Sequence, residues 1–150
     1  MLELTIRAGR KDDSDWLFKL FRESNKDFID ECWGWDEIFQ FEAFNTVLPG
    51  RSFRILEKDG DAIGGYHLAA KPEHFWLELI LIEPGSQRQN YGSLLLDEAK
   101  QIARRSSQPI LLSVLKINPA KYFYVANGFI ETTSDKYSSK MEWRGETPTE

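Results

Sequence analysis

The chain of 150 residues has little of several things that would define a function. It contains one cysteine, Cys32, and two histidines, His67 and His74. A single thiol excludes an internal disulfide framework and a cysteine-rich zinc site, and it is typical of a reducing compartment. The two histidines stand apart in the sequence, so we expect no metal site. Basic side chains number 19 against 24 acidic ones, a net charge of −5, which argues against binding to nucleic acid or to a membrane surface.

Long apolar runs are also missing. The most apolar stretch, residues 75–82, is too short to span a bilayer and contains Glu78. The first residues lack the basic start and apolar run of a signal peptide. We therefore expect a cytoplasmic protein without a membrane partner.

Hydrophobic residues make up 41% of the chain and aromatic residues 13%, enough for a core and for part of a ligand pocket. Helices are predicted after the capping residues 12–14, over 33–44, over 90–105 and from Asn118-Pro119. Strands are predicted over 2–8, 52–57, 62–70, 75–82, 109–115, 129–133 and 137–143. This order predicts an α/β fold with a mixed sheet, in which strands 75–82 and 109–115 are parallel. We expect one domain over residues 1–144 and a flexible tail over 145–150.

Glycines mark specific backbone features in this pattern. Residues 58–61, Lys-Asp-Gly-Asp, predict a hairpin turn between two strands. Gly64-Gly65 predicts a bulge or a close approach of two backbones. Gly128 is expected to end the short helix in the left-handed conformation.

The segment after strand 75–82 is the first that suggests chemistry. It runs through Glu83-Pro84-Gly85-Ser86 and Gln87-Arg88-Gln89-Asn90-Tyr91-Gly92-Ser93 into a helix. A strand, a tight loop and a helix start collect backbone N–H groups and the positive helix end at one point, which suits a phosphate. Asn90 is able to adopt the left-handed conformation. The segment matches neither the P-loop nor the dinucleotide fingerprint, and a polar turn without a ligand is an equally good interpretation of it alone.

A second motif distinguishes the two interpretations. Residues 118–129, Asn-Pro-Ala-Lys-Tyr-Phe-Tyr-Val-Ala-Asn-Gly-Phe, resemble the N-P-A-x-x-x-Y-x-x-x-G-F segment of the GNAT superfamily of acyl-CoA-dependent N-acetyltransferases. That family's earlier loop has the pattern Gln/Arg-x-x-Gly-x-Gly/Ala, and residues 87–92 match it in register with Asn90 in place of the first glycine. The resemblance implies a GNAT fold, a central mixed sheet of about seven strands flanked by about four helices.

The resemblance also implies that acetyl-CoA is the acyl donor. It places the pyrophosphate on the loop and helix start, the pantetheine arm on backbone amides at the end of strand 75–82, and further contacts on the second motif. The implied cofactor-binding residues are Leu81, Ile82, Gln87, Arg88, Gln89, Asn90, Tyr91, Gly92, Ser93, Asn118, Lys121 and Tyr124. For Asn118 a purely capping role is the alternative.

Acetyl transfer to an amine needs a base and benefits from an acid at the leaving thiolate. Tyr124 occupies the position of the family's usual tyrosine acid, and a core tyrosine is the alternative. Glu78 is the candidate base, because a carboxylate in an apolar run is costly to bury and has a raised pKa there. Alternation places Glu78 on the face of Trp76, Ile80 and Ile82, and a structural or solvent-facing glutamate is the alternative.

In this family the N-terminal helices usually shape the acceptor pocket. Trp33, Trp35 and Asp36 are candidates for holding a cationic amine, with His67 as a further candidate. An aromatic core stripe is the alternative for Phe39 and Phe44. The resulting hypothesis is an N-acetyltransferase acting on a primary amine of a small molecule or peptide. The alternative is an acyl-CoA-binding sensor without turnover, and a homodimer is suggested by analogy with the family.

Overall fold

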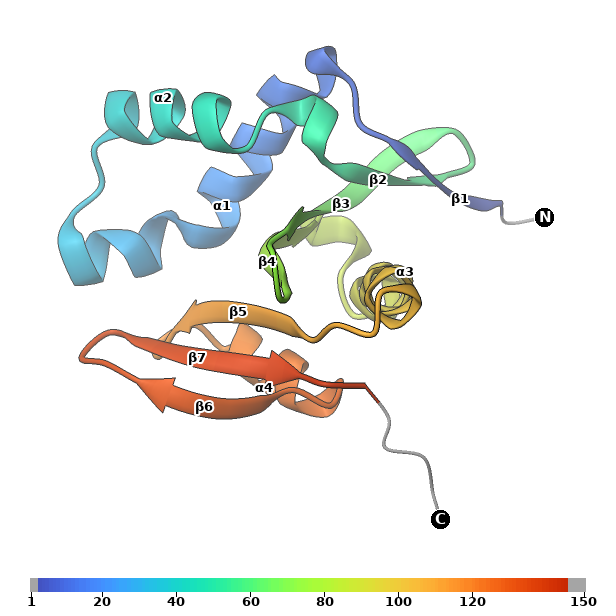
Figure 1. Cartoon of the computed structure of the whole chain (residues 1–150). Coiled ribbons are helices and arrows are strands. Elements are labelled where there is room, and N and C mark those ends of the chain that lie inside the picture. The colour runs from blue at the N-terminus through green and yellow to red at the C-terminus, as the bar shows by residue number, and fades with distance from the viewer. Residues whose placement is uncertain (1–2, 146–150) are drawn as a thin grey trace. The chain divides into compact units, whose positions relative to one another are not determined.

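The structure is a computed structural model that describes residues 3–145 (Figure 1). Its strands are β1 (Leu4–Ala8), β2 (Arg54–Lys58), β3 (Asp61–Ala70), β4 (Phe75–Ile82), β5 (Ile110–Leu115), β6 (Ile130–Ser134) and β7 (Ser138–Trp143). Its α-helices are α1 (Ser14–Trp33), α2 (Glu37–Val47), α3 (Tyr91–Arg105) and α4 (Ala120–Ala126), with short 3₁₀ helices η1 (Lys11–Asp13), η2 (Gly50–Ser52) and η3 (Pro84–Ser86). The strands form a mixed sheet in the order β1-β2-β3-β4-β5-β7-β6. The predicted α/β class with seven strands and four helices is confirmed.

Contacts divide the chain into two compact units, which are described separately. The first comprises the chain as far as His67 together with Leu79–Leu95, and the second comprises Leu68–Glu78 and the chain from Leu96. The single domain over residues 1–144 stays a prediction. Of the predicted tail, residues 146–150 lie outside the described residues. No helix within residues 3–145 is long and apolar enough to cross a membrane.

In the first unit, β1, β2 and β3 form an antiparallel ladder. The predicted hairpin turn joins β2 and β3, and its two central residues, Asp59 and Gly60, both have positive φ, 52° and 89°. A two-residue hairpin of this kind requires left-handed residues at both positions, which explains why an Asp-Gly pair stands there.

The glycine pair in β3 allows two close backbone approaches, as predicted. A Cβ on Gly64 would lie 2.6 Å from the carbonyl oxygen of Leu81, and one on Gly65 would lie 2.8 Å from that of Arg54. The register of β2 and β3 also shifts between Leu56 and Glu57. Any side chain at position 64 would therefore displace the end of β4.

Helices α1 and α2 pack on each other through aromatic rings. Phe18 contacts Phe41 and Phe44 edge-on at centroid distances of 5.2 and 5.6 Å. Phe44 is the buried residue of α2 and belongs to a core cluster with Leu17 and Leu81. Because rings from both helices fill this core, the two helices form one layer on the strands of their unit.

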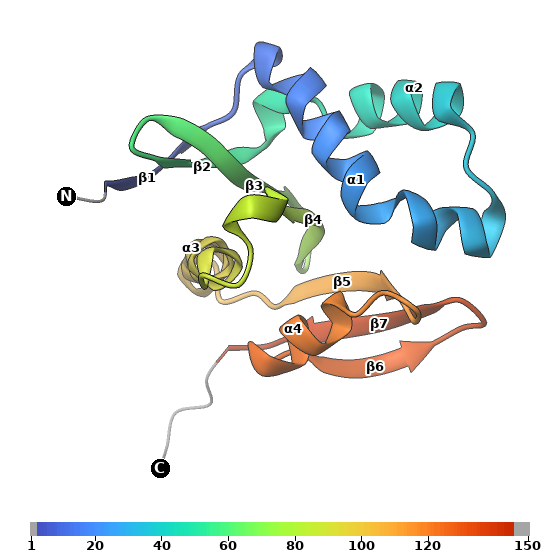
Figure 2. The same cartoon turned by 180° about the vertical axis from the view of Figure 1, so that it is seen from behind.

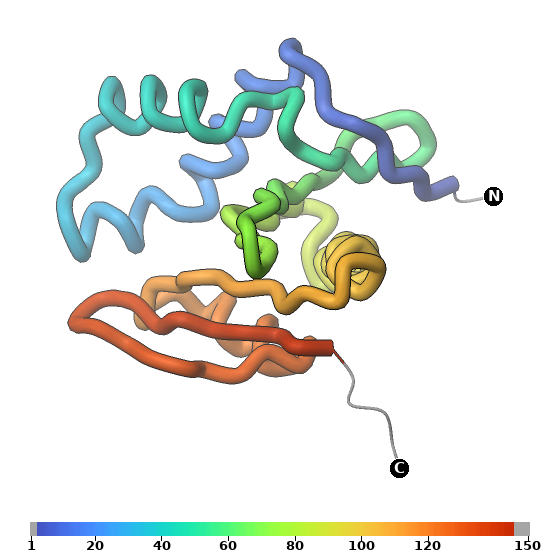
Figure 3. Tube along the Cα trace, in the orientation of Figure 1, coloured from blue at the N-terminus to red at the C-terminus, as the bar shows by residue number. Residues whose placement is uncertain are grey.

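The predicted helix over residues 33–44 is wrong at its start. Trp33 is the last residue of α1, and Gly34 then takes φ 85° and ψ 149°, a conformation confined to glycine. A short connection leads into α2 (Figure 3), where the Asp36 carboxylate accepts the N–H of Phe39 at 3.0 Å. Gly34 ends α1 and the Asp36 N-cap starts α2, so the region forms two helices.

In the second unit, β5, β7 and β6 form an antiparallel ladder, and β4 pairs with β5 in parallel. The three strands lie side by side with α4 over one face (Figure 2). Gly128 has φ 90° just after α4, as predicted. On α3, Lys100 is buried: its ammonium donates to the Asn127 carbonyl at 2.5 Å and lies 5.4 Å from the ring centre of Trp143.

Candidate functional site

The loop between β4 and α3 begins at a firmly anchored residue. The Glu83 carboxylate accepts a hydrogen bond from the indole N–H of Trp16 in α1. The N–H of Glu83 donates to the Ile63 carbonyl at 2.8 Å, and its own carbonyl accepts the N–H of Ser86 at 2.9 Å. A helix, a neighbouring strand and the loop's own turn thus fix the point where the loop starts.

Two residues of this loop have left-handed backbone conformations. Asn90 has φ 65°, which confirms the conformation predicted for it, and Arg88 has φ 64°. Asn is among the non-glycine residues that tolerate this region best, so Asn90 keeps the geometry that a glycine would provide. The left-handed Arg88 was missed, because arginine carries no such preference.

The loop leads into α3 with several backbone donors still unused by the helix. The first helical bond of α3 runs from the N–H of Leu94 to the carbonyl of Asn90, at 3.1 Å. The N–H groups of Tyr91, Gly92 and Ser93 therefore precede the helical ladder. Together with the positive end of the helix dipole, they form the donor set that a phosphate needs.

The side chains of the loop contribute unequally to this donor set. Arg88, Gln89 and Asn90 are exposed, and the Arg88 guanidinium adds a positive charge. The Gln87 amide donates to the Ile82 carbonyl at 3.2 Å, which ties the loop to the end of β4. The Tyr91 ring is buried and lies 5.8 Å from the Lys58 ammonium, so only its backbone is available to a ligand.

Leu81 and Ile82 end β4 beside Gly64. The Leu81 side chain is buried in the core cluster of the first unit. What Leu81 offers to a ligand is therefore its backbone, held in place by the close approach of Gly64 to its carbonyl.

Glu78 lies in the first half of β4, which belongs to the second unit. Phe75 and Leu77 are buried while Trp76 and Glu78 are half-buried. This alternation places Glu78 on the face of Trp76, as predicted. That face is the less buried one, so the Glu78 carboxylate is not fully buried as a member of an apolar run was expected to be.

Tyr124 lies in the second unit, on α4, with only 8% of its surface exposed. Its ring contacts Phe123 and Phe129 edge-on at 5.3 and 5.7 Å. Burial raises the pKa of the Tyr124 phenol. Like any tyrosine, the group is protonated at neutral pH, as a proton donor must be.

Asn118 and Lys121 flank the start of α4. The Asn118 Oδ1 accepts the N–H of Ala120 at 2.9 Å, so the capping role is seen, and the Nδ2 group is the part left for a ligand. The Lys121 ammonium is paired with the Glu131 carboxylate at 2.9 Å. Because Glu131 already pairs with its charge, the Lys121 ammonium needs no ligand to balance it.

The residues predicted for the acceptor have diverse environments in the first unit. Trp33 is 60% exposed at the end of α1. Trp35 is half-buried, 6.0 Å from the Phe21 ring, and its indole donates to Glu37 at 2.9 Å. Asp36 caps α2 through one carboxylate oxygen. His67 is buried edge-on to Phe53 at 5.4 Å.

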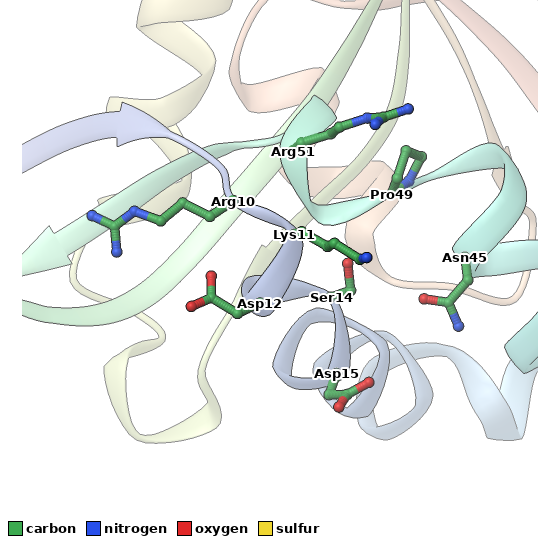
Figure 4. A pocket seen from close by; sticks show the side chains of 8 residues that line it. All are labelled: Arg10, Lys11, Asp12, Ser14, Asp15, Asn45, Pro49 and Arg51. Atoms are coloured by element: carbon green, nitrogen blue, oxygen red, sulfur yellow. The ribbon is translucent and has the colours of Figure 1, made fainter.

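A charged surface pocket in the first unit has none of these residues in its lining (Figure 4). It is lined by Arg10, Lys11, Asp12, Ser14, Asp15, Asn45, Pro49 and Arg51. The Arg10 and Arg51 side chains point in different directions (Figure 4), so its cations do not converge on one point. Because it contains none of the predicted donors, it is not the candidate acyl-CoA site. Within residues 3–145, no three His, Cys, Asp or Glu side chains are grouped to hold a metal ion.

Comparison with known proteins identifies the family. The model of the acetyltransferase (GNAT) domain matches residues 49–131, which include both motifs and the whole β4–α3 loop. The chain belongs to the GNAT acetyltransferase family. It is therefore a GNAT-type N-acetyltransferase that acts with CoA, and the resemblance inferred from residues 87–92 and 118–129 is confirmed. No curated protein matches the sequence.

Solved structures share the fold of this GNAT chain at low sequence identity. PaiA N-acetyltransferase from Thermoplasma acidophilum, in complex with coenzyme A, is 22% identical with a TM-score of 0.76, covering 95% of this chain and 99% of its own. The ribosomal-protein-S18-alanine N-acetyltransferase from Escherichia coli is 18% identical with a TM-score of 0.71, covering 94% and 93%. N-acetylglutamate synthase from Neisseria gonorrhoeae, complexed with coenzyme A and N-acetyl-glutamate, is 17% identical with a TM-score of 0.69, covering 95% of this chain and 35% of its own.

Proposed function

We propose that the protein transfers the acetyl group of acetyl-CoA to a primary amine of a small molecule or peptide, by direct attack in a ternary complex. The observation that carries the proposal is the β4–α3 loop. Its left-handed Asn90 and the N–H groups of residues 91–93 make a phosphate-binding helix start at the position of the family's motif. In the same proposal the enzyme is cytoplasmic, which the single cysteine supports.

Backbone groups hold most of acetyl-CoA, and side chains add further contacts. The N–H groups of Tyr91, Gly92 and Ser93 bind the pyrophosphate, with the Arg88 guanidinium adding charge. The backbone of Leu81 and Ile82 binds the pantetheine arm and polarises the thioester carbonyl. Gln87, Gln89 and the Nδ2 group of Asn118 complete the donor set, and Lys121 contributes less because the Glu131 carboxylate pairs with its ammonium.

Acetyl-CoA supplies an acetyl group already activated as a thioester. An alkylammonium, with a pKa of about 10.4, becomes nucleophilic only after it loses a proton. Glu78 accepts this proton, directly or through one water, so that the neutral amine can attack the carbonyl carbon. Tyr124 is a protonated phenol at neutral pH, as any tyrosine is. It delivers its proton to the departing sulfur and takes up the second proton of the nitrogen as the tetrahedral adduct becomes the amide.

The acceptor is recognised from the N-terminal side of the chain. The exposed Trp33 and the second carboxylate oxygen of Asp36 are the groups best able to contact a cationic amine. Trp35 and His67 stay in the proposal as supporting residues, since both are packed against aromatic neighbours.

The first experiment combines acetyl-CoA titration by calorimetry with thiol release on a panel of amines. Wild-type protein should bind acetyl-CoA and release thiol with at least one amine. Glu78→Gln should lower kcat by a factor on the order of 10² or more, the usual contribution of a general base, while leaving the Kd for acetyl-CoA within about twofold of wild type, because Glu78 is given no part in donor binding.

Glu73→Gln is the matched control, because Glu73 is an exposed glutamate just before β4. It should change neither quantity. Unchanged turnover in Glu78→Gln would remove the base assignment. Donor binding without thiol release on any amine would favour the sensor instead of the transferase, and absence of donor binding would overturn the proposal.

A further inference from the structure

Helix α2 has apolar side chains on all sides yet buries very little. Of its eleven residues, Phe44 is the buried one. Ile38 is 71% exposed, Phe39 64%, Val47 60% and Phe41 44%. A helix that is apolar all round is normally covered on all sides, so one side of α2 lacks the neighbour that its sequence requires.

The outer face of α2 consists of Ile38, Phe39 and Glu42. At 100° per residue, Ile38 and Phe39 point away from Phe44, which faces the core of the first unit. Glu42 follows Ile38 by four residues and Phe39 by three, so the three side chains are neighbours on the helix surface. Figures 1 and 2 show α2 with α1 and the η2 connection beside it.

The charge of the segment that carries this face restricts what can cover it. Residues 22–48 contain seven acidic and two basic side chains, a net charge of −5, which equals the net charge of the whole chain. Within residues 3–145, Glu42 has no ion pair, whereas Glu37 is paired with Arg22 at 2.7 Å. A second copy of the chain would bring like charges together, and an anionic lipid surface would be repelled.

We propose that the outer face of α2 is a docking surface for a cationic amphipathic segment of another polypeptide. Apolar side chains of that segment cover Ile38 and Phe39, and a lysine or arginine pairs with Glu42. An amphipathic helix laid along an apolar face is a common recognition mode. The inference goes beyond the proposed acetyl transfer, because this docking involves neither the β4–α3 loop nor Glu78 or Tyr124.

The test uses a fluorescein-labelled peptide of about 15 residues with leucine and lysine at helical spacing, titrated with the full chain and read by anisotropy without acetyl-CoA. Wild-type protein should bind it, and the Kd should rise several-fold between 50 and 300 mM salt, because the charges become screened. The same peptide with glutamate in place of lysine should bind at least tenfold more weakly.

The double variant Ile38→Ser/Phe39→Ser should weaken peptide binding at least tenfold, and Glu42→Lys should weaken it by a similar factor. Both leave the buried core intact because the substituted side chains are exposed. The control is Ile130→Ser, which removes an isoleucine of similar exposure, 63%, on β6, and it should leave the Kd unchanged.

Equal binding of the lysine and glutamate peptides, or wild-type affinity in the Ile38→Ser/Phe39→Ser variant, would overturn the proposal. So would concentration-dependent dimerisation of the wild type that this double variant abolishes, because a second copy would then be the occupant. Thiol release with a small amine is measured in parallel. Its absence would bear on the proposed acetyl transfer and leave the docking result standing.

Discussion

Replacement of Asn90 by valine tests the loop that carries the proposed function. Asn90 has φ 65°, and an L-residue in this conformation costs roughly 1–2 kcal/mol, a cost that Asn reduces and a β-branched residue increases. We expect the valine loop to leave the left-handed conformation when free and to return to it on binding. With 1.4 kcal/mol for each factor of ten, about 1–2 kcal/mol corresponds to a roughly 5- to 30-fold higher Kd for acetyl-CoA.

The assay is a calorimetric titration with acetyl-CoA, with thermal unfolding measured on the same samples. Asn90→Gly should bind at least as tightly as wild type, because glycine adopts this conformation without penalty. Ser107→Val is the matched control: Ser107 has φ 51° in a turn of the second unit, so this change should lower the Tm by a few degrees and leave the Kd unchanged.

A wild-type Kd in Asn90→Val would refute the reasoning, because donor binding would then not depend on a left-handed residue at position 90. A Kd raised equally in Ser107→Val would refute it as well, since backbone strain anywhere in the chain would have the same effect.

Two further predictions concern Gly64 and Tyr124. Gly64→Ala places a Cβ 2.6 Å from the Leu81 carbonyl oxygen, so it should lower the Tm by several degrees and weaken acetyl-CoA binding. Gly85→Ala is the control, because a Cβ there meets nothing within 4 Å, and it should leave the Tm unchanged. Equal Tm values for the two variants would contradict the close approach. Burial raises the pKa of Tyr124 in the folded protein, so above pH 10 the unfolded chain loses this proton first and the folded wild type loses stability. Urea unfolding at pH 8 and pH 10.5 should show a smaller loss of unfolding free energy in Tyr124→Phe than in the wild type. Identical losses would count against a buried phenol.

Local rules were enough to predict several features from the sequence. β4 occupies the predicted residues 75–82, because a continuous apolar run bounded by Pro-Gly leaves few alternatives. Asn90 and Gly128 take the left-handed conformations expected of their residue types. Gly64 allows the close approach expected of a glycine inside a strand.

Features that depend on distant partners could not be predicted. Lys100 follows the polar side of the α3 pattern, but Asn127 and Trp143 lie 27 and 43 residues further along the chain and bury it. Trp33 and Phe44 appeared to share one helix, because aromatic spacing continues across Gly34 while the backbone does not. The left-handed Arg88 has no residue-type signal at all.

The bond between Trp16 and Glu83 has a consequence for when the N-terminal part of the chain can fold during synthesis. Leu81 completes the core cluster around Leu17 and Phe18, and Glu83 completes the hydrogen bond to Trp16. Because the first unit closes only with Leu79–Leu95, a nascent chain that has reached His67 lacks part of its own core. The N-terminal helices can therefore pack stably only after β4 and the loop that follows it have been synthesised. A chain truncated before β4 should not form a stable helix layer.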